Sequence, residues 1–539
     1  MTDVPRPVNE PVRAYAPGSA DRKELKAALA ELRAEPAEIP LFIGGQETRT
    51  GQPAKVAEPH DHARSLGSAA QAGAADVQRA IEAAAKASPG WAATAFEERA
   101  SVFLRAAELL AGPWRSRLNA ATMLNQSKTA FQAEIDAACE LIDFFRFNVE
   151  YARQIEAIQP GSAPGMWNRC EYRELEGFVL AVTPFNFTSI AGNLPTAPAL
   201  MGNVVLWKPA GTALLSGWII MDLLRAAGLP DGVVNFLPGK GSTIGEVALN
   251  HPDLAGIHFT GSTPVFRGMW KTVGDNLERY KSFPRLVGET GGKDFVFAHP
   301  SADVAALAVA LVRGAFEYQG QKCSAASRAY IPKSLWPDLR DRLVDTLAQI
   351  TVGDPTDFSH LMGAVIDRAS FENCQRYIER ARADQDSTIV AGGECDGRSG
   401  WFVQPTVIEA RQPKYASMCE EIFGPILTVW VYDDARLDEA LALCDSTSPY
   451  ALTGAVFAED RTAIAVLSAR LRQAAGNFYV NDKPTGAVVG QQPFGGARAS
   501  GTNDKAGSML NLLRWTSVRT IKETFVPPTD WRYPHMSEP

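Results

Sequence analysis

Short β-rich runs alternate with helical runs along most of this chain of 539 residues, and few folds accommodate that pattern. The first series comprises Val204–Lys208 (strand), Thr212–Ala227 (helix), Val233–Phe236 (strand), Ser242–Asn250 (helix), Gly256–Thr260 (strand), Ser262–Leu277 (helix) and Arg285–Val287 (strand). A second series runs from Ser301–Tyr318 (helix) through Arg328–Ile331 (strand) and Lys333–Ile350 (helix) to about Phe494. Strands joined by helices of this length form βαβ units, whose parallel sheet is covered on both faces. We therefore expect an α/β protein with two consecutive doubly wound lobes.

The two ends of the chain depart from this alternation. The first 75 residues read as irregular, with short β-prone patches, and helical patterns follow at Ala74–Ala87, Phe96–Ala111 and Leu118–Ala152. Near the other end, Thr516–Ile521 is a lone β-prone run. A lone strand needs a partner, and we expect the sheet edge of another subunit to supply it, which would make the protein oligomeric.

One segment is long and apolar enough to suggest a membrane span. No charged residue occurs between Gly177 and Trp207. The segment nevertheless contains three prolines and three asparagines, and a helix exposed to lipid could not satisfy so many breaks and amides. We expect buried strands and a buried helix that cross the protein core.

Composition narrows the function further. Lys plus Arg number 53 and Asp plus Glu number 61, so the net charge is −8, and no dense basic stripe suggests nucleic-acid binding. The seven cysteines are scattered, and neither they nor the seven histidines show metal-binding spacing, so we expect no metal site and a reducing compartment. Residues 1–20 lack the features of a signal or transit peptide, which favours a cytoplasmic location.

Two predicted strand-to-helix turns have the location of a phosphate-binding loop. The spacing of Gly239–Gly245 fits neither a P-loop nor the standard dinucleotide fingerprint, and a plain turn is the simpler interpretation. In Phe259–Ser262, the side chain of Ser262 can cap the next helix, or backbone N–H groups can face a pyrophosphate. Both interpretations of each turn stay open at this point.

Three polar residues are candidate catalytic groups. Cys323 lies among small and polar residues that favour an exposed loop. Glu289 follows a predicted strand beside paired glycines, where a ligand can approach the backbone. Asn186 ends a predicted strand, and its amide serves either a structural hydrogen bond or a developing oxyanion. A thiol and a carboxylate in one cleft would supply a nucleophile and a base, although each alone has a plain structural explanation.

Seven ordered motifs together resemble those of the aldehyde dehydrogenase superfamily. They are Thr183–Phe187, Trp207–Ala210, Phe259–Ser262, Glu289–Lys293, Gly320–Cys323, Glu421–Pro425 and Pro493–Gly496. Residues 140–148, 475–483 and 490–505 resemble more narrowly the L-glutamate γ-semialdehyde dehydrogenase branch, also called 1-pyrroline-5-carboxylate dehydrogenase. The resemblance extends from about Asn9 to Tyr533 and implies two Rossmann-like doubly wound lobes, one for the cofactor and one catalytic, with a small β oligomerisation element.

The resemblance implies NAD-dependent oxidation of L-glutamate γ-semialdehyde to L-glutamate, the second step of proline catabolism. Cys323 would attack the aldehyde to give a thiohemiacetal, whose alkoxide the Asn186 amide and the Cys323 N–H would hold. Loss of hydride would leave a thioester, and Glu289 would direct water to hydrolyse it. Burial beside an apolar wall is expected to raise the pKa of this carboxylate, as a base working near neutrality requires.

The same resemblance assigns contacts to the cofactor and to the substrate. Cofactor contacts fall on Thr183, Pro184, Phe185, Lys208, Gly261, Ser262, Glu421 and Phe423. Substrate contacts fall on Phe187, Ser324, Gly486, Ala487 and Phe494. The substrate's α-carboxylate would bind the hydroxyl of Ser324 and the backbone N–H groups of residues 485–487. Gly211 stands where many NAD-preferring relatives have an acidic residue, so the preference for NAD over NADP stays open.

The implied domains divide the chain unevenly. An NAD-binding domain with a helical N-terminal part would cover residues 1–158 and 178–295, and a catalytic domain would cover residues 296–498. Residues 159–177, expected to form a hairpin, and the tail 499–539 would form the oligomerisation element. A homodimer or dimer-based oligomer is expected, with proline dehydrogenase as a candidate partner.

Two other functions fit parts of the pattern. An enzyme with the same machinery would act on another semialdehyde such as succinic semialdehyde, but the Ser324, Gly486 and Ala487 pattern argues against it. A non-catalytic binding protein on this fold would be expected to have lost Cys323, Glu289 or Asn186, and all are present.

Overall fold

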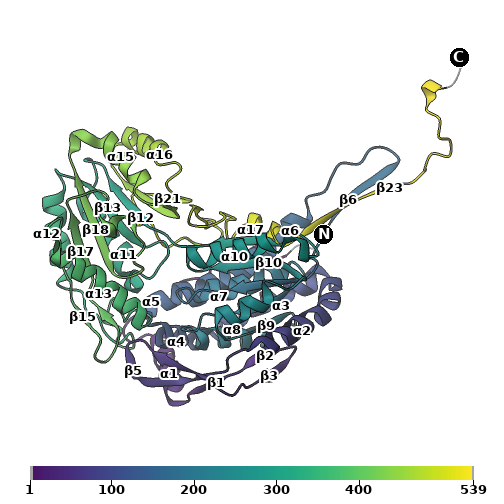
Figure 1. Ribbon diagram of the computed structural model, residues 1–539, viewed down its shortest axis with the longest axis horizontal. Coiled ribbons are helices and arrows are strands. Elements are labelled where there is room, and N and C mark those ends of the chain that lie inside the picture. The colour runs from purple at the N-terminus through teal and green to yellow at the C-terminus, as the bar shows by residue number, and fades with distance from the viewer. Residues whose placement is uncertain (1–3, 537–539) are drawn as a thin grey trace.

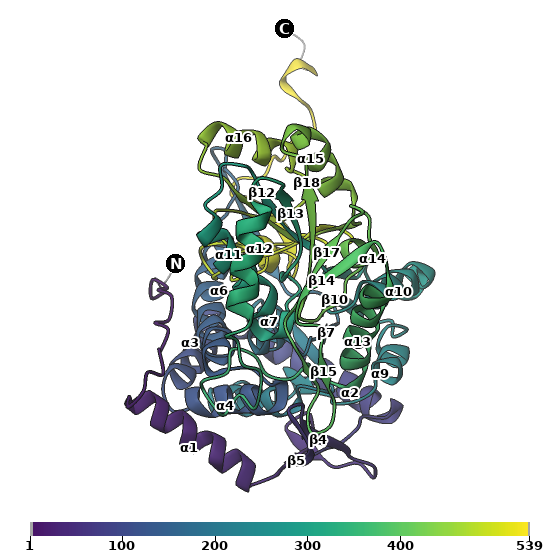
Figure 2. The same ribbon diagram turned by 90° about the vertical axis from the view of Figure 1, so that its left-hand side faces the viewer.

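The computed structural model describes residues 4–536 and is built around two seven-stranded sheets (Figure 1; turned by 90° in Figure 2). The first sheet has the order β11-β10-β7-β8-β9-β2-β3, and the second has the order β14-β17-β18-β13-β12-β20-β21. The strands of the first are β2 (Leu41–Ile43), β3 (Gln46–Thr48), β7 (Phe178–Val182), β8 (Val204–Lys208), β9 (Val234–Phe236), β10 (Leu254–Thr260) and β11 (Arg285–Glu289). Those of the second are β12 (Asp294–Ala298), β13 (Ala326–Pro332), β14 (Ser387–Ala391), β17 (Thr406–Ala410), β18 (Ile426–Tyr432), β20 (Thr453–Phe457) and β21 (Asn477–Val480). In the first sheet, the five strands in the order β11-β10-β7-β8-β9 are all parallel to their neighbours. In the second sheet every adjacent pair is parallel except β14 and β17, which are antiparallel.

Each sheet is covered on both faces. In β8, Val205 and Trp207 join one buried cluster while Val204 and Leu206 join another, as the two-residue period of a strand requires. The first cluster includes α7 (Thr188–Leu200) and α8 (Leu214–Ala226), and the second includes α2 (Ala74–Ala93), α9 (Gly241–Ala248) and α10 (Thr263–Asp275). The second sheet is covered by α11 (Val304–Phe316) and α12 (Trp336–Leu347) on one face, and by α15 (Leu437–Ser446) and α16 (Arg461–Arg470) on the other. The two predicted doubly wound lobes are confirmed.

The N-terminal region is more regular than the sequence suggested. Its first 75 residues contain α1 (Ala20–Ala34), the sheet strands β2 and β3, and the separate sheet of β1 (Ala37–Ile39), β4 (Ala54–Glu58) and β5 (Asp61–Ala69). The expectation of an irregular segment is therefore wrong. Helix α1 was missed because its hydrophobic face is narrow, with only Leu25 and Leu29 buried.

Further helices and short strands complete the two lobes. The helices that follow α2 are α3 (Phe96–Ala111), α4 (Arg115–Gln126), α5 (Ala130–Ala133), a π-helical turn (Glu134–Glu140) and α6 (Leu141–Glu156). The predicted helix at Phe96–Ala111 is confirmed, and the predicted region Leu118–Ala152 is divided among several of these elements. Shorter elements are α13 (Arg368–Ala383), α14 (Ala416–Cys419), α17 (Met509–Leu513), β15 (Cys395–Asp396), β16 (Phe402–Val403), β19 (Tyr450–Ala451) and β22 (Ala497–Arg498).

The uncharged stretch runs through the interior of the first lobe. It forms β7, the buried helix α7 and β8, in agreement with the prediction. Asn193 and Asn203 are buried there, and each has hydrogen-bond partners. No helix within residues 4–536 has the length and apolar character needed to cross a membrane.

A two-stranded ribbon projects from the body of the protein (Figure 1). Its strands β6 (Met166–Arg173) and β23 (Ser517–Thr524) are antiparallel, with Met166 opposite Thr524 and Arg173 opposite Ser517. The C-terminal strand therefore has its partner within the same chain. The expectation that another subunit supplies that partner is wrong, because the distant segment around residue 170 returns to the same place. The segment expected to form a hairpin contributes one strand of the ribbon rather than two.

Candidate active site

Cys323 lies in a largely buried loop that joins α11 to β13 in the second lobe. Helix α11 leads into a short 3-10 turn, in which Tyr318 and Gln319 have left-handed backbone angles, and the loop then enters β13. The neighbours of Cys323 were expected to mark an exposed loop, but Gln321, Lys322 and Ser324 are buried and only Cys323 is partly exposed. That expectation is wrong because most polar groups of the loop are bonded inside the protein, although the Gln321 amide nitrogen has no hydrogen-bond partner within residues 4–536.

The amide of Gln319 shows how the loop is held from inside. Its nitrogen donates to the carbonyls of Ser127 and Ala364, at 3.0 and 2.7 Å. The side-chain oxygen of Gln321 accepts from the Ile366 N–H at 2.9 Å. Buried amides that are bonded in this way fix a loop rather than expose it.

Asn186 contacts this loop directly. Its amide nitrogen donates to the carbonyl of Gln321 at 3.0 Å, two residues before Cys323. The carboxylate of Asp136 anchors the following helix α7 by accepting from the backbone N–H groups of Thr188 and Ser189, at 3.1 and 3.2 Å. An anion at a helix N-terminus stabilises that end of the helix. The sequence motif placed Asn186 here, but it did not reveal the supporting Asp136.

A buried lysine accompanies that carboxylate. The ammonium of Lys128 lies 2.5 Å from Asp136, and it also lies 4.5 Å from the ring centre of Phe187. The sequence feature that could have revealed this pair is the presence of Lys128 and Asp136, two opposite charges, within a largely apolar helical region.

Glu289 ends β11 and is partly buried. Its carboxylate accepts from the Gly496 N–H at 3.3 Å. Burial raises the pKa of this carboxyl well above its usual range, against the lowering effects of that hydrogen bond and of the Lys505 ammonium. The expected direction of this pKa shift is confirmed. Lys505 in turn donates to the carbonyls of Gly476 and Gly495, at 2.8 and 3.0 Å. These bonds fix the segment whose Gly496 N–H contacts Glu289.

The thiol of Cys323 has several carboxylates around it. Burial raises its pKa well above the usual range, and the negative charges of Asp294, Glu289 and Glu421 raise it further. The thiol is therefore protonated at neutral pH in this structure, and a base must take its proton before it can act as a nucleophile. Asp294, which the sequence reasoning missed, accepts from the Thr453 N–H at 2.7 Å. The sequence feature that could have revealed Asp294 is its position as the first residue of the apolar run that forms β12.

The paired glycines bring three separate motifs into contact. A Cβ atom on Gly291 would lie 2.2 Å from a carboxylate oxygen of Glu421, and one on Gly292 would lie 2.1 Å from the Cys323 carbonyl. The Gly292 N–H donates to Glu421 at 2.9 Å. Only a residue without a side chain allows this close approach, so the glycines position the thiol loop and Glu421 relative to Glu289.

Six of the residues expected to bind the cofactor follow or end strands β7, β8 and β10 of the first sheet, whereas Glu421 and Phe423 lie between α14 and β18 of the second lobe. The rings of Phe185 and Phe423 meet edge to face at 5.8 Å between centres. Thr183 pairs with the end of β8, where its N–H donates to the Lys208 carbonyl at 3.1 Å. Burial lowers the pKa of the Lys208 ammonium. Pro184 is partly buried in the same turn.

Both glycine turns lead from a strand of the first sheet into a helix. Ser262 occupies the N-cap position of α10, but its side chain makes no capping hydrogen bond. The first N–H groups of that helix therefore remain for a ligand, as the second interpretation of the turn requires. Gly261 donates its N–H to the Glu289 carbonyl at 3.2 Å, which ties this turn to β11. Gly239–Gly245 covers the end of the turn after β9 and the first residues of α9, which begins at Gly241. The N-cap residue of that helix, Lys240, likewise makes no side-chain capping hydrogen bond.

The residues expected to bind the substrate are divided between the thiol loop and the segment after β21. The hydroxyls of Ser324 and Thr485 are 2.7 Å apart and buried. Gly486 is exposed and has a φ of +100°, which favours glycine, and Ala487 is partly buried. Phe494 pairs with Ala506 across an isolated bridge. Phe187 and Phe494 are both partly buried.

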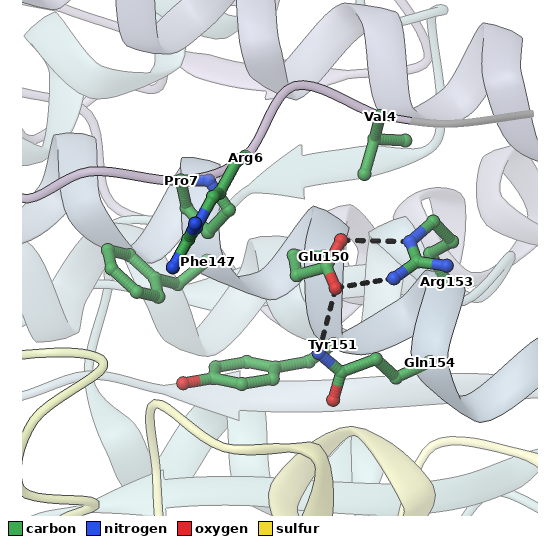
Figure 3. A pocket seen from close by; sticks show the side chains of 8 residues that line it. All are labelled: Val4, Arg6, Pro7, Phe147, Glu150, Tyr151, Arg153 and Gln154. Atoms are coloured by element: carbon green, nitrogen blue, oxygen red, sulfur yellow. Dashed lines mark hydrogen bonds and ion pairs between the residues drawn. The ribbon is translucent and has the colours of Figure 1, made fainter.

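A separate cavity of about 450 Å³ lies between the N-terminal segment and α6 (Figure 3). Its lining residues are Val4, Arg6, Pro7, Phe147, Glu150, Tyr151, Arg153 and Gln154. None of the candidate site residues is among them. In the described part of the chain, no group of three or more His, Cys, Asp or Glu side chains could hold a metal ion.

Comparison with known proteins agrees with this geometry. The aldehyde dehydrogenase family's sequence profile matches residues 46–521. A delta-1-pyrroline-5-carboxylate dehydrogenase of Dictyostelium discoideum is 55% identical over all of this chain and 97% of its own. The crystal structure of the Mycobacterium tuberculosis delta-pyrroline-5-carboxylate dehydrogenase bound with NAD is 57% identical, with a TM-score of 0.96 over 100% of this chain and 99% of that one. Proline utilization A from Bdellovibrio bacteriovorus is 30% identical, with a TM-score of 0.92, over 98% of this chain and 55% of that chain.

The expected cytoplasmic location is contradicted by these relatives. The Dictyostelium discoideum protein and its bovine, mouse and human counterparts are all named mitochondrial. The expectation failed because it rested on the composition of residues 1–20, which carries no positive signal for any compartment. The matched family profile, the identity over the full length and the common fold lead to one assignment: this chain belongs to the aldehyde dehydrogenase family, in its delta-1-pyrroline-5-carboxylate dehydrogenase branch.

Proposed function

We propose that this chain oxidises L-glutamate γ-semialdehyde, formed from 1-pyrroline-5-carboxylate, to L-glutamate in proline catabolism. The observation that carries the proposal is the grouping of a thiol, a high-pKa carboxylate and an amide at one loop, in a chain 55% identical to a named delta-1-pyrroline-5-carboxylate dehydrogenase. NAD supplies the hydride acceptor, as the NAD-bound relative supports.

Cys323, Glu289 and Asn186 divide the chemistry among them. The Cys323 thiol first loses its proton to water, and the raised pKa of Glu289 suits this carboxylate to the later hydrolytic step near neutral pH. The Cys323 sulfur attacks the aldehyde carbon, and the Asn186 amide, together with the Cys323 N–H, donates to the resulting alkoxide. Hydride leaves the carbon and a thioester remains. Glu289 then takes a proton from water, whose attack releases L-glutamate and returns the thiol.

The cofactor site draws on both lobes. The uncapped N-terminus of α10, with Gly261 and Ser262, holds the pyrophosphate, and Lys208 binds a ribose at the end of β8. Glu421, which the Gly292 N–H fixes, accepts from the other ribose. The aromatic pair of Phe185 and Phe423 packs beside it, with Thr183 and Pro184 shaping the turn.

The substrate's carboxylate selects it over other aldehydes. The N–H groups around Gly486 and Ala487 bind it together with Ser324, whose hydroxyl is held by Thr485. Phe187 and Phe494, both partly buried, pack on either side of the aliphatic chain. A succinic semialdehyde has a shorter chain and could not reach the carboxylate site and the thiol together.

The remaining proposals concern organisation. The first sheet belongs to an NAD-binding domain of residues 1–158 and 178–295, and the second belongs to a catalytic domain of residues 296–498. Residues 159–177 and 499–539, which contain the ribbon, serve assembly into a homodimer or a dimer-based oligomer. Residues 1–3 and 537–539 of these ranges lie outside the described part. Proline dehydrogenase is the partner that supplies the substrate, which the similarity to proline utilization A supports.

The test is NADH formation by the purified protein with L-glutamate γ-semialdehyde, beside succinic semialdehyde. The proposal expects efficient turnover of the first alone, and no turnover by Cys323→Ala. Equal rates on the two aldehydes would contradict the carboxylate site. No NADH from folded protein with either aldehyde would favour a non-catalytic binding protein.

A further inference from the structure

An ammonium group lies beside the loop that is proposed to bind the substrate's carboxylate. A Cβ atom built on Gly486 would lie 3.3 Å from Nζ of Lys483 and 3.9 Å from its Cε. Gly486 is exposed, whereas Lys483 is partly buried. The ammonium therefore lies beside the exposed glycine of the turn, close enough to reach a carboxylate bound there.

The backbone of Lys483 is fixed against helix α11. A Cβ atom on Gly314 would lie 3.3 Å from Cβ of Lys483 and 3.4 Å from Cδ of Pro484, so the glycine allows this segment to pack closely on the helix. The next residue, Thr485, is bonded to Ser324 in the thiol loop. The lysine is thus held at a defined distance from Cys323 through a short, buried connection.

The charge of Lys483 is not neutralised by the protein. Two nearby cations have partners, since Lys322 lies 3.2 Å from Glu317 and Lys128 lies 2.5 Å from Asp136. For residues 4–536, the structure has no carboxylate within 4.0 Å of the Lys483 ammonium. Burial lowers the pKa of Lys322, and the charges of Lys128 and Lys483 lower it further, so each of these two ammonium groups lies within electrostatic reach of Lys322. An ammonium without a carboxylate partner attracts an anion.

We propose that Lys483 is a specificity-determining residue, whose ammonium binds the α-carboxylate of the substrate over Gly486. The inference rests on the proposed function and adds a side-chain ion pair to the backbone and hydroxyl contacts. It explains selection for a carboxylate-bearing aldehyde by charge as well as by shape, because a charge-assisted hydrogen bond is stronger than a neutral one.

The test compares Lys483→Met and Lys483→Arg with wild-type enzyme on two aldehydes. L-Glutamate γ-semialdehyde carries the carboxylate, and butanal does not. We expect Lys483→Met to raise KM for the semialdehyde about 30-fold, or about 2 kcal/mol, with kcat much less affected. KM for butanal should stay within about twofold, and Lys483→Arg should recover most of the loss. Lys86→Met, an exposed lysine on α2, is the matched control and should match wild type.

Binding of the product separates this inference from the proposed function. Calorimetry with L-glutamate needs no turnover, so it applies even to a protein that does not oxidise the semialdehyde. Weaker binding of L-glutamate to Lys483→Met than to wild type supports the ion pair. An unchanged KM for the semialdehyde, an equal rise of KM for both aldehydes, or equal binding of L-glutamate to the two proteins would overturn it. Absence of semialdehyde oxidation by wild type would instead overturn the proposed function.

Discussion

Replacing Gly292 by alanine should disable the thiol loop while leaving the protein folded. The added Cβ would lie 2.1 Å from the Cys323 carbonyl oxygen and 2.5 Å from a carboxylate oxygen of Asp294, whereas real Cβ atoms essentially never approach closer than 3.0 Å. The carbonyl must therefore retreat by at least 0.9 Å, the difference between 3.0 and 2.1 Å. A displacement of about 1 Å in a reacting group is enough to slow a reaction about a hundredfold.

The assay is kcat/KM for NADH formation with L-glutamate γ-semialdehyde, measured together with the melting temperature. We expect Gly292→Ala to lose about a hundredfold in kcat/KM. Its free energy of unfolding should fall by about 1–3 kcal/mol, the usual cost of overpacking. Gly90→Ala on α2 is the matched control, because a Cβ there meets no atom within 4 Å. A Gly292→Ala enzyme whose activity stays within about threefold of wild type would refute the argument that this glycine positions Cys323.

Three further predictions follow from the same contacts. Asn186→Ala should lower kcat at least about a hundredfold, because a donor to the oxyanion is lost. An unchanged kcat would show that Asn186 serves only as a structural hydrogen-bond donor to the Gln321 carbonyl. Because burial raises the pKa of Glu289, its base form is lost as pH falls, so steady-state NADH formation should rise with pH. The Glu289→Gln variant should give one burst of NADH without further turnover. Sustained turnover by that variant would contradict the role of Glu289 in hydrolysis. Burial alone would raise the pKa of Glu58, but the hydrogen bonds and charges of His60 and Arg33 outweigh burial and lower that pKa from 4.5. The stability that this carboxylate contributes above pH 4.5 is therefore lost as the pH falls further. Arg33→Met should therefore cost about 3 kcal/mol at neutral pH and flatten this acid loss in urea unfolding, whereas parallel pH profiles would contradict it.

The regular part of the fold was predictable because its signals are local. The strand Val204–Lys208 has the predicted bounds. A strand that is buried on both faces is a nearly continuous apolar run, and helix-breaking residues flank this one. The partner of Thr516–Ile521 was not predictable, because β6 lies more than 300 residues earlier and a short exposed strand has no local feature that names its partner. Pairing over such a distance is decided by tertiary structure.

The candidate site shows the same division. Cys323, Glu289 and Asn186 could be found because their motifs are local in sequence. Burial of the thiol loop could not be inferred, since the amides that satisfy it, such as Gln319, bond to residues almost 200 positions away. The role of Asp294 was likewise hidden, because a pKa depends on charges from several elements that meet only in the fold.

Covalent catalysis by Cys323 is the central claim, and trapping the thioester tests it most directly. Glu289→Gln protein mixed with NAD and L-glutamate γ-semialdehyde is digested and analysed by mass spectrometry. The account predicts a glutamyl adduct on the peptide that contains Cys323 and on none of the six other free cysteines, with no adduct in a variant that also carries Cys323→Ala. NADH formation without an adduct, an adduct on another cysteine, or turnover by Cys323→Ala alone would contradict it.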